Sequence, residues 1–77
     1  MEPWKERFIN EYNELKDRTE KLAAMLEKYQ SGTLDFTPNC SFNLLHEQLV
    51  YMTQYLRVLR ERAQIEKLDV EGSVDNG

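Results

Sequence analysis

The chain has 77 residues and a formal net charge of −4, with 40% hydrophobic and 31% charged residues. A chain of this length forms one domain at most, and a single small domain buries little interior, so oligomerisation is expected. Three of the negative charges come from Asp69, Glu71 and Asp75, which leaves the rest of the chain nearly neutral. This balance argues against the broad positive field that non-specific binding to duplex nucleic acid requires.

Cysteine usage and hydropathy indicate the cellular setting. Cys40 is the only cysteine, so the sequence predicts no intrachain disulfide and no CxxC site, and it suits a reducing cytoplasm. No apolar run approaches the roughly 20 residues that span a bilayer, and the N-terminus lacks the basic-then-apolar order of a signal peptide. We therefore expect neither secretion nor contact with a membrane.

The first predicted element is a helix over residues 4–30. This stretch contains no Gly or Pro, and its apolar residues recur at intervals of three, four or seven, which is the period of one helix face. These residues are Trp4, Phe8, Tyr12, Leu15, Leu22, Leu26 and Tyr29. Thr19 interrupts the face, where its methyl group can pack while its hydroxyl bonds to the preceding turn. Gly32 predicts a left-handed C-terminal cap.

The second predicted element is a helix over about residues 38–67. Two caps compete for its start, namely Thr37 with Pro38 just inside, and the later Ser41. One apolar series has the spacing that packing against another helix requires, and it consists of Leu45, Leu49, Met52, Leu56, Leu59 and Ala63. A second series repeats every seven residues, with Tyr55 between the two series, and it consists of Leu44, Tyr51, Val58 and Ile65.

The two series together cover about half of the circumference of this helix, whereas packing against one partner helix needs little more than a stripe of about 100°. A single hairpin cannot bury both. We therefore predict an all-α helical hairpin of two long antiparallel helices, over residues 1–67, that either self-associates or presents a docking surface. Residues 68–77 contain two Gly, three acids and no helical period, which predicts a flexible acidic tail.

Catalytic and metal-binding motifs do not occur in the sequence. His46 is the only histidine, there is no HExxH motif, and residues adjacent to it on a helix face different directions. Acids alternate with bases at helical spacing, as in Glu14, Arg18 and Lys21, which is typical of a solvated face with weak ion pairs. The sequence therefore predicts no metal, no cofactor and no enzymatic activity.

Cations and aromatic rings flank the apolar seams. One side of the first helix carries Arg7, Arg18, Lys21, Met25 and Lys28, and the second helix carries Tyr51, Tyr55, Val58 and Arg62 at intervals of four, three and four. Rings stack on nucleobases and fixed cations bind phosphates, so a groove between protomers lined by these residues could hold a small nucleotide. The alternative is structural, because flanking bases often pair with acids and tyrosines in a stripe often form core or rim.

Motifs on both helices resemble those of a known family. Residues 5–15 read KERFINEYNEL and are followed by Glu20-Lys21-Leu22, and residues 44–52 read LLHEQLVYM and are followed by Tyr55, Val58-Leu59 and Glu61-Arg62. This pattern resembles a family of very small tailed-phage proteins, which is similar to the helical hairpin of phage anti-CBASS and anti-Thoeris sponge proteins. Those sponges sequester the cyclic oligonucleotide or cyclic ADP-ribose signals of bacterial immunity without cleaving them.

The resemblance implies a homo-oligomer, typically a hexamer, that holds ligands between protomers in the cytoplasm of an infected bacterial host. It also implies a phosphate-binding lysine on the first helix, a stacking aromatic residue, and an arginine near the end of the second helix. The matching candidates are Lys21 or Lys28, Tyr12 or Tyr51, and Arg62. Tyr12 lies within the main apolar seam, so a core role competes with stacking. The candidate ligand-binding residues are Arg7, Tyr12, Lys21, Lys28, Tyr51, Tyr55 and Arg62.

Two functions follow as hypotheses. The first is an anti-defence sponge that binds a cyclic di- or trinucleotide, or a cyclic ADP-ribose type signal, and lowers its free concentration by mass action. The second is a helical protein–protein interaction module of phage origin with no small-molecule ligand, in which the wide apolar surface of the second helix docks a partner helix.

Overall fold

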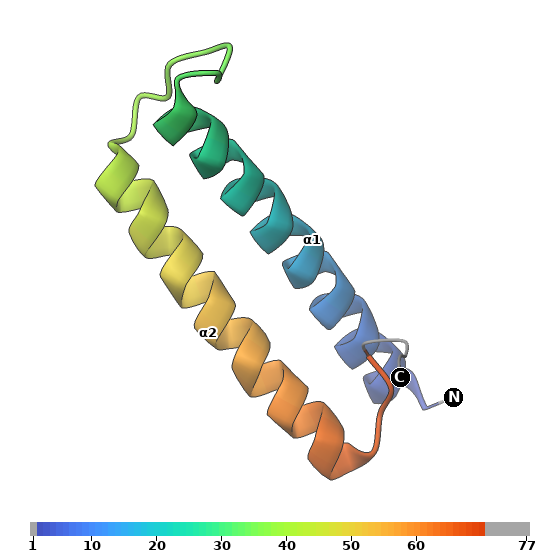
Figure 1. Cartoon of the computed structure of the whole chain (residues 1–77). Coiled ribbons are helices and arrows are strands. Elements are labelled where there is room, and N and C mark those ends of the chain that lie inside the picture. The colour runs from blue at the N-terminus through green and yellow to red at the C-terminus, as the bar shows by residue number, and fades with distance from the viewer. Residues whose placement is uncertain (1, 71–77) are drawn as a thin grey trace.

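A computed structural model describes residues 2–70, which form two helices packed side by side in an antiparallel hairpin (Figure 1). Helix α1 comprises Pro3–Ser31 and helix α2 comprises Phe42–Glu66. The start of α1 and the end of α2 lie at the same end of the hairpin. The predicted fold class is therefore confirmed.

Both ends of α1 follow from local chemistry. Pro3 occupies the first helical position, where its fixed φ suits the helix and its missing N–H costs nothing. Gly32 ends the helix at φ 76°, and the next backbone N–H, that of Thr33, donates to the Lys28 carbonyl at 2.9 Å. A left-handed residue costs least when it is glycine, so the predicted cap at Gly32 is confirmed.

Helix α2 begins at Phe42, so the predicted start at residue 38 is wrong. Ser41 is the N-cap, and its hydroxyl accepts a hydrogen bond from the Leu44 N–H at 3.1 Å. The three residues before Phe42 are Asn39, Cys40 and Ser41, which have low helix propensity. The later of the two candidate caps therefore determines the start of the helix.

The main core lies in the half of the hairpin that contains the start of α1 and the end of α2. Its buried members are Phe8, Tyr12, Leu56, Leu59 and Ala63, and Leu15 packs against them. Towards the connecting segment the packing is looser, because Leu45, Leu49 and Met52 are only half-buried. Thr19 is buried and its hydroxyl donates to the Leu15 carbonyl at 2.7 Å, as predicted.

The chain beyond α2 turns back onto this core. Lys67 adopts φ 58°, and the Leu68 N–H donates to the Ala63 carbonyl at 2.8 Å, which closes the helix end. Leu68 and Val70 are half-buried against the core. The expectation of a flexible tail from residue 68 is therefore wrong for these first residues, and positions 71–77 lie outside the described residues.

The second apolar series of α2 remains largely in solvent, and together with the exposed ring of Tyr55 we call it the outer stripe. It consists of Leu44, Tyr51, Tyr55, Val58 and Ile65, and the exposed fractions of its members range from 43% for Val58 to 77% for Ile65. The seam that faces α1 includes Leu59 and Ala63, which are 0% and 1% exposed. One hairpin thus buries one series only, as expected. No helix in the described part of the chain has the length and apolar character to cross a membrane.

The two candidate caps of α2 provide a direct stability test. Ser41→Ala removes the acceptor for the Leu44 N–H and should lower the free energy of unfolding by about 1 kcal/mol. Thr37→Ala is the matched control and should change it by only a few tenths, because Thr37 lies outside the helix. Urea unfolding followed by circular dichroism measures both variants. A larger loss for Thr37→Ala than for Ser41→Ala would contradict this assignment.

Candidate functional site

One contact between the helices shows which side of α1 borders the outer stripe. The Tyr55 hydroxyl of α2 donates a hydrogen bond to the Glu11 carboxylate of α1. Arg7 lies four residues before Glu11, which places it about 40° around the helix at roughly 100° per residue. Arg7 therefore lies on the same side of the hairpin as Tyr55.

Tyr12 belongs to the core and not to this side. Its side chain is 0% exposed, and its hydroxyl accepts a hydrogen bond from Arg60 Nε at 3.1 Å. Burial leaves no ring face for a nucleobase, so Tyr12 cannot stack on a ligand unless the hairpin opens. Of the two roles that the sequence leaves open for this residue, the structure supports the core role.

Tyr55 and Arg62 are held together near the start of α1. The Arg62 guanidinium lies over the Phe8 ring, 4.8 Å from its centroid, in a cation–π contact. The hydrogen bond to Glu11, followed by desolvation and the negative charge of Glu11, raises the pKa of the Tyr55 phenol, and the positive charge of Arg62 acts in the opposite direction. This end of the hairpin therefore presents a half-exposed ring beside a positioned cation.

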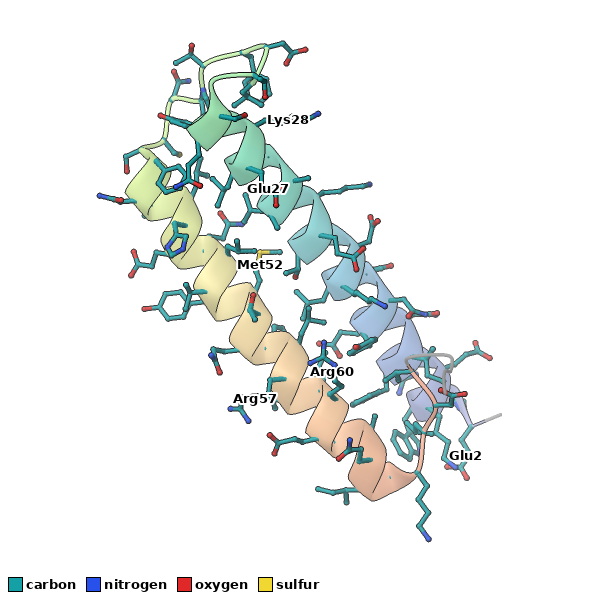
Figure 2. The ribbon with its side chains drawn as sticks, viewed as in Figure 1. Glu2, Glu27, Lys28, Met52, Arg57 and Arg60 are labelled. Atoms are coloured by element: carbon teal, nitrogen blue, oxygen red, sulfur yellow. The ribbon has the colours of Figure 1, made fainter. Side chains whose placement is uncertain are left out.

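Tyr51 lies in a shallow hollow of about 620 Å³ on the surface of α2. The hollow is lined by Leu44, Glu47, Gln48, Tyr51, Met52 and Tyr55. The Tyr51 hydroxyl donates to Glu47 Oε2 at 3.3 Å, and 66% of the Tyr51 side chain is exposed. Figure 2 shows that Met52 lies on the side of α2 that faces α1. The hollow thus offers aromatic and apolar surface with only a few polar groups, which suits a flat ring.

Lys21 and Lys28 lie in a different hollow, at the other end of α1. The connecting segment closes one side of it with Leu34, Asp35 and Phe36. Lys21 Nζ is 3.0 Å from Asp17, but both side chains are largely exposed, so this ion pair contributes little. Lys28 points away from α2 (Figure 2). An anion from solvent can therefore bind to either lysine with little loss of existing ion-pair energy.

A single hairpin does not bring these lysines to the tyrosines. Lys21 and Lys28 follow Glu11 by ten and seventeen residues, which places them about 15 and 25 Å further along the axis of α1. They are also turned about 80–100° around the helix from Glu11, on the side away from α2. Arg7, Tyr55 and Arg62 form one group in the structure, and the two lysines form another.

Sequence reasoning missed one residue beside each of these two groups. Glu11 fixes the Tyr55 hydroxyl, and no local signal reveals this because the pairing depends on how the two helices align. Phe36 presents a ring that is 55% exposed beside Lys21 and Lys28. Its position in a connecting segment of irregular backbone gave no period from which its exposure could be predicted.

The histidine and the cysteine lie apart from the group formed by Arg7, Tyr55 and Arg62. His46 is exposed, and its ring stacks on Phe42 with the centroids 6.0 Å apart. Cys40 is exposed in the connecting segment. Within residues 2–70 no three His, Cys, Asp or Glu side chains gather closely enough to hold a metal ion.

Comparison with known proteins identifies one family. A family model described as Sequestin matches residues 2–65, which cover helix α1 and all but the last residue of α2. No curated protein and no solved structure matches the chain.

The link between Glu11 and Tyr55 predicts a change in an alkaline titration. Glu11→Gln removes the charge and weakens the hydrogen bond, so the pKa of Tyr55 should fall towards its ordinary value of 10.0. Phenolate absorbance measures it, with Tyr55→Phe identifying the Tyr55 contribution. Because the folded pKa is raised, the associated stability is present below the ordinary pKa and is lost as pH rises through the folded value. Glu11→Gln should diminish that alkaline loss.

Glu14→Gln is the matched control for this titration. Glu14 pairs with Arg18 at 3.9 Å on the same helix, and both side chains are exposed. This variant should leave the pKa of Tyr55 unchanged. Equal shifts in the Glu11 and Glu14 variants would mean that the general charge of α1, rather than the hydrogen bond, controls Tyr55.

Proposed function

This chain belongs to the Sequestin family, and we propose that it is a phage anti-defence protein that binds a cyclic nucleotide signal of bacterial immunity and holds it uncleaved. The ligand class is a cyclic di- or trinucleotide, or a cyclic ADP-ribose type signal. The family name supports sequestration, and the resemblance of the helix motifs to phage sponges supports the class of ligand. The proposed place of action is the cytoplasm of the infected host.

One observation supports the proposal most strongly, namely that the exposed ring of Tyr55 lies near Arg62, with the exposed ring of Tyr51 about one helical turn away. Tyr51 and Tyr55 are 66% and 45% exposed, and stacking of a base on such a ring contributes about 1–3 kcal/mol. Arg62 lies close enough to Tyr55 to affect its pKa. A guanidinium can hold a phosphate through two parallel hydrogen bonds. Together these groups match the two chemical parts of a nucleotide.

The proposed mechanism is mass action and needs no reacting group. A protein in excess over the signal, with a dissociation constant below the threshold of the defence effector, lowers the free signal below that threshold. A dissociation constant of about 1 nM corresponds to roughly 12 kcal/mol of binding free energy. Two stacked rings and several phosphate contacts reach such a binding free energy only if water is excluded from the site. This requirement supports a site that is enclosed between protomers of a homo-oligomer. We expect a hexamer from the resemblance.

The two lysines complete the proposed site from a neighbouring protomer. Lys21 and Lys28 are too far from Tyr55 to contact the same small ligand within one hairpin. Each lies on the outside of α1, where a second copy of the chain can approach. A ligand held by rings and arginines of one copy and lysines of another would be bound only by the assembled protein.

Ligand binding can be tested with a thermal-shift panel of cyclic dinucleotides, cyclic trinucleotides and cyclic ADP-ribose isomers. A ligand present at about 100 times its dissociation constant stabilises the protein by roughly 2.7 kcal/mol, which raises the melting temperature measurably. At least one member of the panel should produce this shift. If none does, the chain is better explained as a helical interaction module. Recovery of intact ligand after denaturation distinguishes sequestration from turnover.

The role of Arg62 can be separated from that of a general positive charge. Arg62→Gln should weaken binding of the active ligand at least tenfold, because a phosphate loses its charged partner. Arg57→Gln is the matched control, since Arg57 bonds to Glu61 on its own helix and points away from α1 (Figure 2). Calorimetric titration measures both. Equal losses in the two variants would contradict a specific role for Arg62.

A further inference from the structure

The outer stripe runs along α2 from Leu44 to Ile65, about 32 Å, and its apolar surface is not covered by another helix of the hairpin. We propose that a second copy of this chain covers it, with the two α2 helices antiparallel about a two-fold axis between residues 54 and 55. This inference concerns which face associates and in which register. It does not depend on the class of ligand.

Four of the five residues of the stripe are placed symmetrically about that midpoint, and the fifth, Tyr55, lies next to it. Leu44 and Ile65 lie equally far from it in sequence, and so do Tyr51 and Val58. Antiparallel pairing therefore brings Leu44 of one copy to Ile65 of the other and Tyr51 to Val58, each contact occurring twice. A two-fold interface requires this kind of self-complementary surface.

Charges on α2 favour the same arrangement. Glu47 and Arg62 are also equally far from the midpoint, so antiparallel pairing places each Glu47 at the level of the Arg62 of the other copy. A parallel pairing in register would place Glu47 beside Glu47 and Arg62 beside Arg62. Opposite charges at the same level favour the antiparallel register, and like charges at the same level disfavour the parallel one.

Helix α1 provides an independent check on the register. Within the hairpin, Phe8 contacts Arg62 and Tyr29 contacts Phe42, which fixes the level of each α1 residue relative to α2. The α1 helices of the two copies then run antiparallel. Glu11 bonds to Tyr55 of the outer stripe, so the Glu11 side of each α1 is the side nearer to the second copy.

In that arrangement acidic residues of one α1 lie at the same level along the axis as basic residues of the other. To within about one residue, or roughly 1.5 Å, Glu14 lies level with Arg18 and Glu11 lies level with Lys21 of the second copy. All four side chains are exposed. At roughly 100° per residue, Arg18, Glu14 and Lys21 are turned about 20°, 60° and 80° around α1 from Glu11, so the match is one of level along the helix axis. The register was set by apolar residues of α2 alone, so this charge match on α1 is a second, separate argument for it.

The same pairing gathers the cations that one hairpin keeps apart. It brings Lys21 and Lys28 of one copy level with the end of the other that carries Arg7, Tyr55 and Arg62. Each end of the pair would then present four cations beside an aromatic ring. This consequence rests on the proposed function, whereas the pairing itself rests on the stripe and the charges.

Disulfide trapping tests the pairing in ligand-free protein. In a Cys40→Ser background, Tyr51→Cys and Val58→Cys variants are oxidised separately and as a mixture, and products are read by non-reducing electrophoresis and mass spectrometry. The mixture should yield the 51–58 heterodimer. Each variant alone should not dimerise, because identical positions lie about 10 Å apart along the axis, beyond the roughly 7 Å limit between Cα atoms of a disulfide.

Arg57→Cys in the same background is the control, because position 57 is turned about 100–120° around the helix from Val58 and Tyr51, at roughly 100° per residue. Helical circular dichroism of each variant verifies that the hairpin is folded. Dimers of 51 with 51 and of 58 with 58, without the mixed product, would overturn the antiparallel register. Yields no higher than that of the Arg57 variant would overturn the interface itself. Neither result bears on the ligand panel, so failure of the pairing and failure of the proposed ligand are distinguishable.

Discussion

The structure depends on one constraint, namely that α2 carries apolar residues on two faces while α1 can cover only one. Leu59 and Ala63 on the covered face are almost completely buried, and Tyr51 and Ile65 on the other face are 66% and 77% exposed. Burial of one such side chain contributes about 1.5–3 kcal/mol. The isolated hairpin does not gain the burial free energy of the five exposed members of the outer stripe. Association with a second molecule can supply it.

The same constraint explains why the candidate site is divided. The packed end of the hairpin holds Arg62 over Phe8 and Tyr55 on Glu11, so a ring and a guanidinium are fixed in position. The lysines of α1 lie at the opposite end and face outward, beside the exposed ring of Phe36. A small anionic ligand could use both groups only if a second molecule brings them together. Assembly and ligand binding are therefore parts of one physical account.

Local sequence patterns were sufficient to predict the fold. The period of the apolar residues predicted both helices, Gly32 predicted the end of α1, and Thr19 predicted a hydroxyl bonded back to Leu15, because each of these depends on residues within about one turn. The start of α2 could not be predicted because two caps were available, and the bond from Leu44 to Ser41 decides between them. The packing of Leu68 and Val70 depends on the left-handed turn at Lys67, which the residue type at that position does not predict.

The candidate site was less predictable because its geometry depends on contacts between the helices. Periodicity placed Tyr12 in the seam without showing whether its ring would be accessible, and the structure buries it beneath Arg60. It placed Lys28 on one side of α1 without showing its distance from Tyr55. The partner of Tyr55 is 44 positions away in sequence, and such a pairing follows from how the helices align and not from any local motif.

The central claim is that a second copy of the chain covers the outer stripe, and the mass of the ligand-free protein in solution tests this most directly. Sedimentation equilibrium over a wide range of concentrations should give an even multiple of the 9.2 kDa chain mass, such as a dimer or a hexamer. Tyr51→Glu places a charge within the stripe, and it should shift that mass towards the single chain while the helical content is retained. A wild-type protein that sediments as one folded 9.2 kDa chain at every concentration would contradict the account.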